Sequence, residues 1–586
     1  MLVVIVMGVA CYKQAEPQGF GKGSERGGEM RYLSSFVGAT ILTVSGIASI
    51  HSQVITNSRS PAEFEEVQGV VICWFEEQYL TIFALVEEYG WTPILLEQYQ
   101  GLMNTQTTLV QEALNEGVEV YVMDDTSHNQ VWGKYYSDYL VPDTLAALGI
   151  NSPLLRVVPE KGQNSPWSRD WGPFSIYKEG ADSLYLAGRP FNQLIADYIS
   201  RPFYQTTIMD GGNYLTDGFG NLFCDAKQPD IDLVTFGITD SVRVADYKVH
   251  IDYYLKLINE ETFIVNEIPF SNYRPPFDYF FGDSAVLDSV VERLSQRISC
   301  YGRPYKFIRI KTAPTLDSNN VTVFTSEASY ANSLILNRTV LVPQYQYSVQ
   351  TDTAALNLYK KLMPGYRVVG IPAWHFAGMG GTIHCITREI ASDEPVFVSH
   401  AWYPDTVNQT SGYPVEAVIR TRSGVANAAV YWTTDTTLGF QAIAMTNPGG
   451  DTFTASVPGQ AYGTRVYYYI QAAANSSKVG KKPLVAPSWA YNFLVLEPGA
   501  CVAKPGDANA SGTYTLGDVI SGVNYIFNKP GCVPTPLCWL SGLLCRGDWN
   551  ASGTVTLGDV IQAVNFIFNK PGGPWNALAV GVCCLP

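Results

Sequence analysis

The segment GGTIHCITREI, residues 380–390, decides how the largest part of the chain is interpreted. In it, Cys385 directly follows His384 and stands behind a pair of glycines. A cysteine in an exported chain is often half of a disulfide, and one in an α/β domain is more often a small buried apolar residue. The third interpretation is a thiol nucleophile, which needs an imidazole and orienting groups from elsewhere in the sequence.

The region around this segment, residues 54–395, has the pattern of an α/β domain. The apolar runs GVVICWF (69–75), VEVYVM (118–123) and RVVGIPA (367–373) have the length and the β-branched content of buried strands. Between such runs lie helical patterns, for example DTAALNLYKKLM at 352–363. The alternation predicts strands connected by helices.

A different pattern follows. From residue 400 to 497 the helical patterns cease, and runs such as AVYWTT, TFTASV and RVYYYIQAA alternate between Gly, Pro and Asn turns. This spacing of short strands is typical of an Ig-like β-sandwich. The segment EPGACVAKPG, residues 497–506, is typical of a linker.

The tail contains an internal repeat: GDANASGTYTLGDVISGVNYIFNKPG from Gly506 and GDWNASGTVTLGDVIQAVNFIFNKPG from Gly547. Each copy places oxygen-bearing side chains at alternate positions around a glycine and ahead of an amphipathic helix, which is the ligand spacing of a calcium loop. The predicted ligands are Asp507, Asn509, Ser511, Thr513 and Asp518 in the first copy, and Asp548, Asn550, Ser552, Thr554 and Asp559 in the second.

Residues 501–574 resemble a dockerin-type module, in which two calcium-loop and helix units pack together. The resemblance implies calcium in the tail and a cohesin-like partner. Because Ser511 and Ser552 replace common carboxylates, and Asp replaces Glu at the last ligand position, we expect weaker calcium affinity. Six of the eleven cysteines lie in the last 86 residues, as in a disulfide-stapled exported tail that ends in a cysteine-containing segment at 575–586.

The N-terminal region has the features of an export signal. Residues 30–52 combine one arginine, an apolar run and small residues near their end, which predicts a signal peptide and no membrane span after its removal. We therefore expect a secreted or cell-surface bacterial protein. Residues 1–29 are interpreted as upstream sequence translated by mistake, the alternative being a lipoprotein signal with Cys11 lipidated. A net charge of −15 argues against nucleic-acid binding and favours cationic partners.

Four polar segments interrupt the apolar runs of the α/β domain. They are SPWSRDWGP around Asp170, MDGGNYLTDG around Asn213, VHIDYY with His250 and Asp252, and the segment of Cys385. Together they supply a thiol, an imidazole and two carboxylates. Carboxylates can orient a planar guanidinium by paired N–H bonds, a thiolate can attack its carbon, and an imidazole can protonate departing ammonia and then activate water.

Six segments of the chain resemble, in the same order, motifs of the agmatine deiminase and Porphyromonas-type peptidylarginine deiminase family. They are SRDWGP, GGNYLTDG, HIDYYLKL, NSLILN, MPGYRVVGIP and GGTIHCIT. The resemblance implies a pentein fold, a pseudo-fivefold α/β propeller of ββαβ-type units around a central site, with no cofactor for catalysis. It implies a covalent thiouronium intermediate, and these site residues: Cys385 as nucleophile, His250 as general acid/base, Asp170 and Asp252 as guanidinium-binding carboxylates, Asn332 as a further polar residue of the site, Trp167 against the substrate side chain, and Asn213 in substrate binding.

Three local expectations accompany this assignment. If residues 250–252 form a strand, His250 and Asp252 face the same side of it. On a strand, His384 would point away from the side of Cys385, and we interpret it as structural. Asp170 follows Arg169 directly, so an ion pair between the two is the alternative to a role in binding.

The substrate stays open between several guanidines. Export and an appended sandwich resemble the peptidylarginine type, which favours arginine in peptides or proteins, converted to citrulline. That type holds a C-terminal carboxylate with an Arg-Pro-Arg arrangement, whereas GRPFN here has Arg189 in the first position and Phe191 in the second. Gly380 is closer to the agmatine type. Agmatine or free arginine, amidino transfer to an amine, and a non-catalytic adhesin for arginine-rich peptides are the alternatives.

Overall fold

The structure of the protein is a computed structural model. It describes residues 58–74, 82, 85–86, 88–90, 92–125, 130–131, 134–135, 141–160, 165–178, 183–206, 210–225, 232–245, 250–268, 284–316, 322–324, 328–377, 379–406, 411–496, 507–508, 514–527, 529, 546–549 and 555–568. The predicted signal peptide, residues 1–29 and the C-terminal segment 575–586 lie outside these ranges. Among the described helices, none combines the length and the apolarity needed to cross a bilayer.

Five sheets of the described α/β domain share one topology. In each, two antiparallel strands are followed by a third that lies parallel to the second. Four of them take their strands in chain order: β7 (Phe174–Lys178), β8 (Ser183–Gly188) and β9 (Phe203–Gln205); β10 (Leu215–Thr216), β11 (Asn221–Cys224) and β12 (Asp240–Arg243); β13 (Leu255–Asn259), β14 (Thr262–Glu267) and β15 (Lys306–Lys311); β18 (Leu334–Leu336), β19 (Thr339–Gln344) and β20 (Arg367–Pro372).

The fifth sheet closes the domain on itself. Its antiparallel pair joins β21 (Thr387–Ala391), from the end of the domain, to β2 (Val67–Cys73), from its beginning, and β3 (Glu119–Asp125) and β6 (Leu155–Glu160) follow in parallel. The fivefold repetition of one strand topology confirms the predicted pentein architecture. It also brings β21, which directly follows the segment of Cys385, beside β2 near the beginning of the domain.

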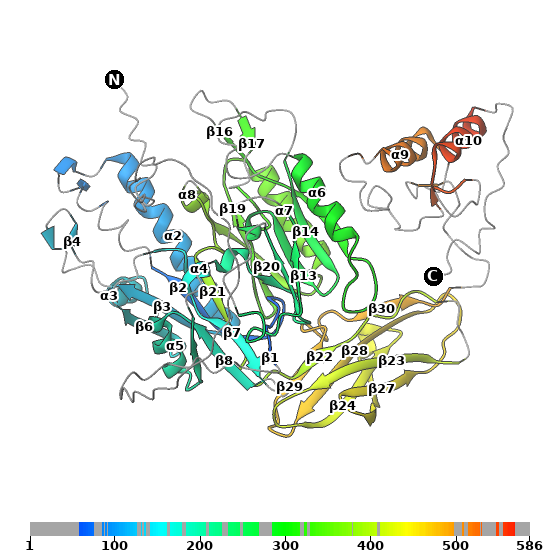
Figure 1. The fold of residues 1–586 in the computed structure, drawn as a ribbon, viewed down its shortest axis with the longest axis horizontal. Helices are drawn as coiled ribbons and strands as arrows, with labels where there is room; N and C mark the ends of the chain where they lie inside the picture. Colours follow the sequence, from blue (N-terminus) through cyan, green and yellow to red (C-terminus); the bar gives the residue numbers. More distant parts are fainter. Residues whose placement is uncertain are drawn as a thin grey trace, which may run out of the picture. The chain divides into compact units, whose positions relative to one another are not determined.

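Helices on the outside of these sheets begin and end where the sequence supplies caps. The helix α2 (Pro93–Glu116) starts at Thr92, whose Oγ1 accepts from Leu95 N at 3.2 Å, and stops at Gly117 with a left-handed φ of 83°. The helix α7 (Val349–Leu362) is capped by Ser348, packs on β19 and β20, and confirms the helix predicted at 352–363. Figure 1 shows α6 (Ser284–Ser295) and α7 beside the strands that they cover.

Short elements complete the domain. They are β1 (Ser58–Arg59), which extends the first sheet beside β7, the hairpins β4 (Gln130–Val131) with β5 (Lys134–Tyr135) and β16 (Pro314–Leu316) with β17 (Thr322–Phe324), the helices α3 (Val141–Ala147), α4 (Ser168–Trp171), α5 (Gln193–Tyr198) and α8 (Trp374–Ala377), and the 3-10 helices η1 (Pro190–Asn192), η2 (Gly211–Asn213) and η3 (Ile251–Tyr253).

The region predicted as a β-sandwich consists of two antiparallel sheets with a shared apolar core. Alternate residues of β23 (Tyr413–Arg420) are buried, as a half-buried strand requires. The three runs quoted from the sequence lie in β24 (Val425–Thr433), β27 (Thr452–Val457) and β28 (Arg465–Ala474), so their strand assignment is confirmed. One sheet contains β22 (Phe397–Ser399), β23 (Tyr413–Arg420), β27 (Thr452–Val457) and β26 (Thr446–Gly449); the other contains β25 (Gln441–Ala444), β24 (Val425–Thr433), β28 (Arg465–Ala474), β29 (Val479–Lys482) and β30 (Tyr491–Leu494).

The tail contains one helix in each sequence repeat, α9 (Leu516–Ile526) and α10 (Leu557–Ile567), which pack against each other (Figure 1). Both begin with a capping box, in which the Asp at the third helical position accepts from the capping Thr backbone N–H at 2.7 Å. Those two residues, Asp518 and Asp559, are buried, as are Asp507 and Asp548. The other predicted ligands, Asn509, Ser511, Thr513, Asn550, Ser552 and Thr554, lie outside the described residues.

Candidate active site

The turn before β21 places Cys385 beside side chains from distant segments of the domain, Asn332 and Asp252. Cys385 is 5% exposed and carries a free thiol. Its carbonyl accepts a hydrogen bond from Arg169 N at 3.0 Å, which ties the turn to α4. Gly381 is required here, because a Cβ would lie 2.3 Å from the ring of Trp167 and 3.0 Å from the Cys385 Cβ. The disulfide interpretation of Cys385 is therefore excluded.

Two side chains contact the sulfur atom. The Asn332 Nδ2 lies 3.3 Å from Cys385 Sγ, and Asp252 Oδ2 lies 3.6 Å from it. Burial, together with the neighbouring Asp252 charge, raises the pKa of the Cys385 thiol well above its ordinary value. The free site therefore holds a thiol, and an arriving cation would favour its ionisation.

Asn332 is fully used in this arrangement. Its Nδ2 also donates to the Asp252 backbone carbonyl at 3.1 Å. Its Oδ1 accepts from His384 N at 3.1 Å and from the Thr382 hydroxyl. The amide thus joins the turn of Cys385 to the segment of Asp252.

His250 stands at the start of η3, so the expected strand at 250–252 is wrong. Its Nε2 lies 2.9 Å from Asp210 Oδ1, and its Nδ1 lies 3.5 Å from Asp170 Oδ1. Burial alone would lower the pKa of His250, but the charges of these carboxylates outweigh it and raise the pKa to about 10. The ring is therefore an imidazolium in the free site and can donate a proton first.

Asp170 faces the site and not its neighbour in sequence. Its Oδ1 accepts a hydrogen bond from Gly212 N at 3.0 Å, and burial raises its pKa. Gly212 leaves room for the imidazole, because a Cβ there would lie 2.4 Å from His250 Nδ1. Arg169 turns the other way and pairs with Glu389 at 2.7 Å. The alternative of an Arg169–Asp170 ion pair is therefore wrong.

The two carboxylate oxygens of Asp252 differ in their hydrogen bonding among the described residues. Its Oδ2 contacts His384 Nδ1 at 2.8 Å. Its Oδ1 is buried and has no hydrogen-bond partner in the described part of the chain. Burial by itself would raise the pKa of the Asp252 carboxyl. The hydrogen bond from His384 and its charge outweigh this effect and lower the pKa, so Asp252 stays ionised. A buried carboxylate oxygen without a donor fits the N–H edge of a guanidinium.

His384 is the residue that the sequence interpretation placed wrongly. Residues 383–386 form a turn and not a strand, so the ring lies toward Asp252 although Cys385 is the next residue. Its other nitrogen, Nε2, lies 2.8 Å from Glu63 Oε1. Glu63 precedes β2 and showed no signal in the sequence. Asp210, the partner of His250, lies within the quoted segment MDGGNYLTDG and could have been noticed there.

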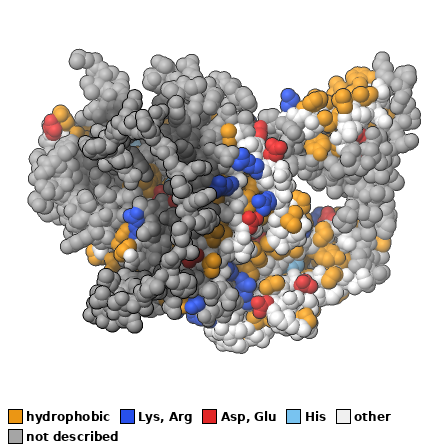
Figure 2. Space-filling view, viewed as in Figure 1, with side chains coloured by type: hydrophobic (Ala, Val, Ile, Leu, Met, Phe, Trp, Pro, Cys, Tyr) orange, Lys and Arg blue, Asp and Glu red, His pale blue; other side chains and the backbone are white. Residues whose placement is uncertain are grey.

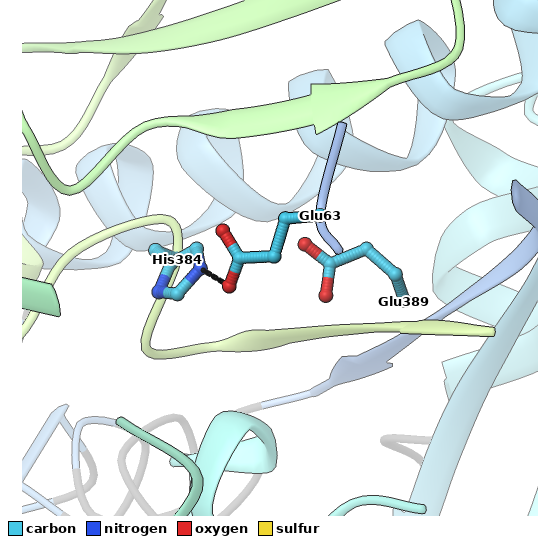
Figure 3. A group of neighbouring side chains, drawn as sticks. All are labelled: Glu63, His384 and Glu389. Carbon is cyan, nitrogen blue, oxygen red and sulfur yellow. Dashed lines mark hydrogen bonds and ion pairs between the residues drawn. The ribbon is translucent and has the colours of Figure 1, made fainter. Parts of the chain in front are cut away.

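Glu63, His384 and Glu389 lie close enough together to suggest a metal site, and Figure 3 shows the Glu63 carboxylate between the other two groups. Protein cations already occupy this space. Arg169 lies 2.7 Å from Glu389 and 3.4 Å from Glu63, and the Lys256 ammonium also contacts Glu63. The cluster is thus a buried charge network of the protein itself.

The three residues predicted to bind substrate have different surroundings. Trp167 is partly buried over Gly381 and forms a wall beside Cys385. The Asn213 Oδ1 accepts from Asp225 N at 2.7 Å and its Nδ2 reaches Asp210 at 3.5 Å, so it supports the partner of His250. Arg189 precedes η1, is half-buried, and among the described residues contacts none of the catalytic side chains named above.

Comparisons with known proteins show which enzymes this chain resembles. The family model of Porphyromonas-type peptidyl-arginine deiminases matches residues 236–390, a range that includes His250, Asp252, Asn332 and Cys385. Proteins assigned as agmatine deiminases in Yersinia pestis and Yersinia pseudotuberculosis are each 24% identical over 287 residues, covering 39% of this chain and 76% of theirs.

Solved agmatine deiminases were also compared. The enzyme of C. jejuni has a TM-score of 0.41 and 14% identity, and that of Enterococcus faecalis has 0.39 and 15%, each covering 57% of this chain and 96% of the other. The fivefold strand pairing, and not these scores, defines the fold. The family match and the sequence relatives both belong to enzymes named as deiminases. The chain is therefore an enzyme of the deiminase type, a hydrolase acting on the C–N bonds of amidines, with agmatine and peptidylarginine deiminases as its relatives.

Proposed function

We propose that the protein is a secreted enzyme that hydrolyses arginine side chains of peptides or proteins to citrulline and releases ammonia. The proposal is carried by the buried thiol of Cys385 beside Asp252, whose Oδ1 has no hydrogen-bond partner among the residues that the structure describes. His250 is held as an imidazolium by Asp170 and Asp210. The family model that matches this region is named for peptidyl-arginine deiminases. The alternative is an exported deiminase of agmatine or free arginine, in line with the names of the sequence relatives.

The proposed reaction begins with orientation of the guanidinium. Asp252 and Asp170 accept N–H bonds from its edges, and the substrate charge favours loss of the Cys385 proton to solvent. The thiolate then attacks the central carbon and forms a C–S bond. His250 donates its proton to one amino group, and the C–N bond breaks as ammonia leaves, which yields a thiouronium bound to Cys385.

Hydrolysis of the intermediate uses the same groups in reverse. With its proton gone, His250 accepts a proton from a water molecule, and the resulting hydroxide attacks the thiouronium carbon. The C–S bond then breaks and the proton of the new hydroxyl passes to the departing sulfur, which returns Cys385 as the thiol and leaves a neutral ureido group on the side chain. Because no group changes oxidation state, the reaction needs no redox cofactor.

The substrate class is tested with the full chain and its Cys385→Ala variant. Ureido product and ammonia are measured on agmatine, free arginine, and peptides with internal or C-terminal arginine. We expect peptides to exceed agmatine in kcat/KM by about tenfold or more. Higher activity on agmatine would instead establish the alternative, and a folded protein inactive on all four would support the non-catalytic adhesin.

Two local features set the expectation for the chain end of the substrate. Two arginines are needed to clamp a carboxylate, but only Arg189 is present here. Phe191 stands at the second position and packs edge-on against Trp171, with the ring centroids 5.5 Å apart. The α-carbon of Gly380 faces open space, because a Cβ there would meet nothing within 4 Å. We therefore propose that internal arginines are accepted alongside C-terminal ones.

The remaining regions are proposed as export and attachment modules. Residues 30–52 would direct export, residues 400–497 would form an Ig-like domain, and residues 501–574 a dockerin-like calcium module. The two helices of this module expose apolar side chains at equivalent positions, and Figure 2 shows hydrophobic side chains gathered over α9 and α10. Such a duplicated apolar surface fits a protein partner of the cohesin type. The exposed pairs are Leu516 and Leu557, Ile520 and Ile561, and Phe527 and Phe568.

Calcium is expected to affect the tail and not the reaction. Asp507 and Asp548 are buried at the start of the two predicted loops, and Trp549 beside them is 2% exposed. Removal of calcium from the full chain with a chelator should change the fluorescence of the tail, while deimination stays the same. The matched control is Asp548→Ala with Trp549 retained, which should show the chelated signal at any calcium concentration. Loss of deimination on chelation would contradict the assignment.

A further inference from the structure

His384 has a carboxylate at each ring nitrogen. Its Nδ1 lies 2.8 Å from Asp252 Oδ2, and its Nε2 lies 2.8 Å from Glu63 Oε1. A neutral imidazole carries one N–H and can donate to one of these groups only, so its bare nitrogen would face the other anion. The pKa values of Glu63 and Asp252 are both lowered, in part by the contacts with His384. Both carboxylates are therefore anions. The arrangement thus calls for an N–H at both nitrogens.

Glu63 is itself fixed from two further sides. The Lys256 ammonium, from β13, contacts its Oε2, and Arg169, from α4, lies 3.4 Å from its Oε1. Arg169 also donates from Nε to the His384 carbonyl at 3.1 Å and pairs with Glu389 of β21. All of these side chains are buried or nearly so. The position of the His384 ring is therefore determined by segments from several units of the propeller.

We propose that Glu63 and His384 form a positioning pair for Asp252. Glu63 fixes the ring through Nε2–H, and the ring fixes Asp252 Oδ2 through Nδ1–H. The other oxygen, Asp252 Oδ1, is then left for the substrate guanidinium, since no group in the described part of the chain binds it. The proposal rests on the deiminase activity but is independent of whether the substrate is a peptide or agmatine.

The pair has a second effect, on the nucleophile. Asp252 Oδ2 lies 3.6 Å from Cys385 Sγ, where an uncompensated carboxylate would oppose formation of the thiolate. An N–H at His384 Nδ1, donated to the same oxygen, offsets part of that charge. Positioning of Asp252 and reactivity of Cys385 are therefore expected to change together when the pair is broken.

Two neutral replacements of His384 distinguish the ring nitrogens. Asparagine places an N–H near the Nδ1 position and retains the bond to Asp252, whereas glutamine places one near the Nε2 position and retains the bond to Glu63. Recognition is measured with two small alkylating agents, chloroacetamidine, which is cationic, and chloroacetamide, its neutral counterpart. In both, Cys385 Sγ forms a bond to carbon and chloride leaves, so the natural substrate is not needed.

The quantity compared is the ratio of the two alkylation rates in the full-length protein. We expect His384→Gln to reduce the ratio roughly 10- to 100-fold, as for loss of a charge-assisted hydrogen bond, and His384→Asn to reduce it less. For the guanidine substrate that the enzyme hydrolyses, KM should rise more in His384→Gln than in His384→Asn. Equal ratios in the two variants, or a ratio unchanged in His384→Gln, would overturn the proposal.

Two further variants separate positioning from folding. His400 is another buried histidine with partners at both nitrogens, the Glu416 carbonyl and the Tyr468 hydroxyl, in the two-sheet region; His400→Gln should leave the ratio unchanged. Glu63→Gln alone should reduce the ratio of the two alkylation rates. Combined with His384→Asn it should have no further effect, because the asparagine has already lost the contact between Glu63 and the Nε2 position of residue 384. Additive losses in the double variant would contradict the coupled pair, whatever substrate the enzyme acts on.

Discussion

Replacement of Cys385 by alanine is expected to reduce turnover of every guanidine substrate by roughly four orders of magnitude or more, because the reaction then lacks its covalent step. The side chain is small and its removal from the turn leaves the hydrogen bond between its carbonyl and Arg169 N in place. We therefore expect binding of the guanidinium to persist. Product formation by ammonia release, together with substrate affinity by calorimetry, measures the two effects separately.

The matched control is Cys224→Ala. Cys224 is a second buried free cysteine of the same domain, at the end of β11, and its sulfur lies 3.7 Å from the Ser241 hydroxyl. Its replacement should reduce stability somewhat, as for any core truncation, with full activity per folded molecule. Turnover that survives in Cys385→Ala, or disappears in Cys224→Ala, would show that the nucleophile has been assigned to the wrong thiol.

Replacement of Asp252 by asparagine is expected to have two opposite effects. Loss of the buried carboxylate removes its charge-assisted hydrogen bond to the guanidinium, which should reduce kcat/KM by about two to four orders of magnitude. At the same time the Cys385 thiol loses the neighbouring negative charge that, after burial, most raises its pKa. Its pKa should therefore fall, and the thiolate fraction at a fixed pH below that pKa should increase.

The two effects are measured on one sample. Alkylation of Cys385 by neutral chloroacetamide, followed against pH, should show a midpoint at lower pH in Asp252→Asn, while alkylation by chloroacetamidine and substrate turnover decline. Asp217→Asn is the control, because Asp217 is equally buried but its carboxylate accepts from the backbone of its own loop, at Phe219 N and Asn221 N. A midpoint that moves to higher pH would contradict the arrangement around Cys385.

Much of the site could be predicted because its members are rare polar residues within apolar runs. Cys385, Asn332 and Asp252 were each marked by such a segment and lie in contact. The strand and helix patterns of the α/β domain were also recovered, as in β20 and α7. Local patterns suffice for these features because periodicity and capping depend on neighbours within one turn or one strand.

The direction of side chains in the turns could not be predicted. Neighbours on a strand point to opposite faces, which predicts that His384 points away from the side of Cys385. The turn at 383–386 instead directs its ring toward Asp252. The same assumption was wrong for His250, which precedes a 3-10 helix. Turns at the ends of strands have no side-chain period, so sequence spacing alone does not tell which way a residue points.

By itself, the sequence determined which chemical groups this protein has, in which order, and therefore the class of reaction that they support. The tertiary structure alone decided how these groups are held. The pairing of β2 with β21 and the contact of Glu63 with His384, 321 residues apart, both depend on closing the propeller. Such contacts form only when distant segments meet in a packed, desolvated core, where partners are selected by geometry and charge and leave no local pattern in the chain.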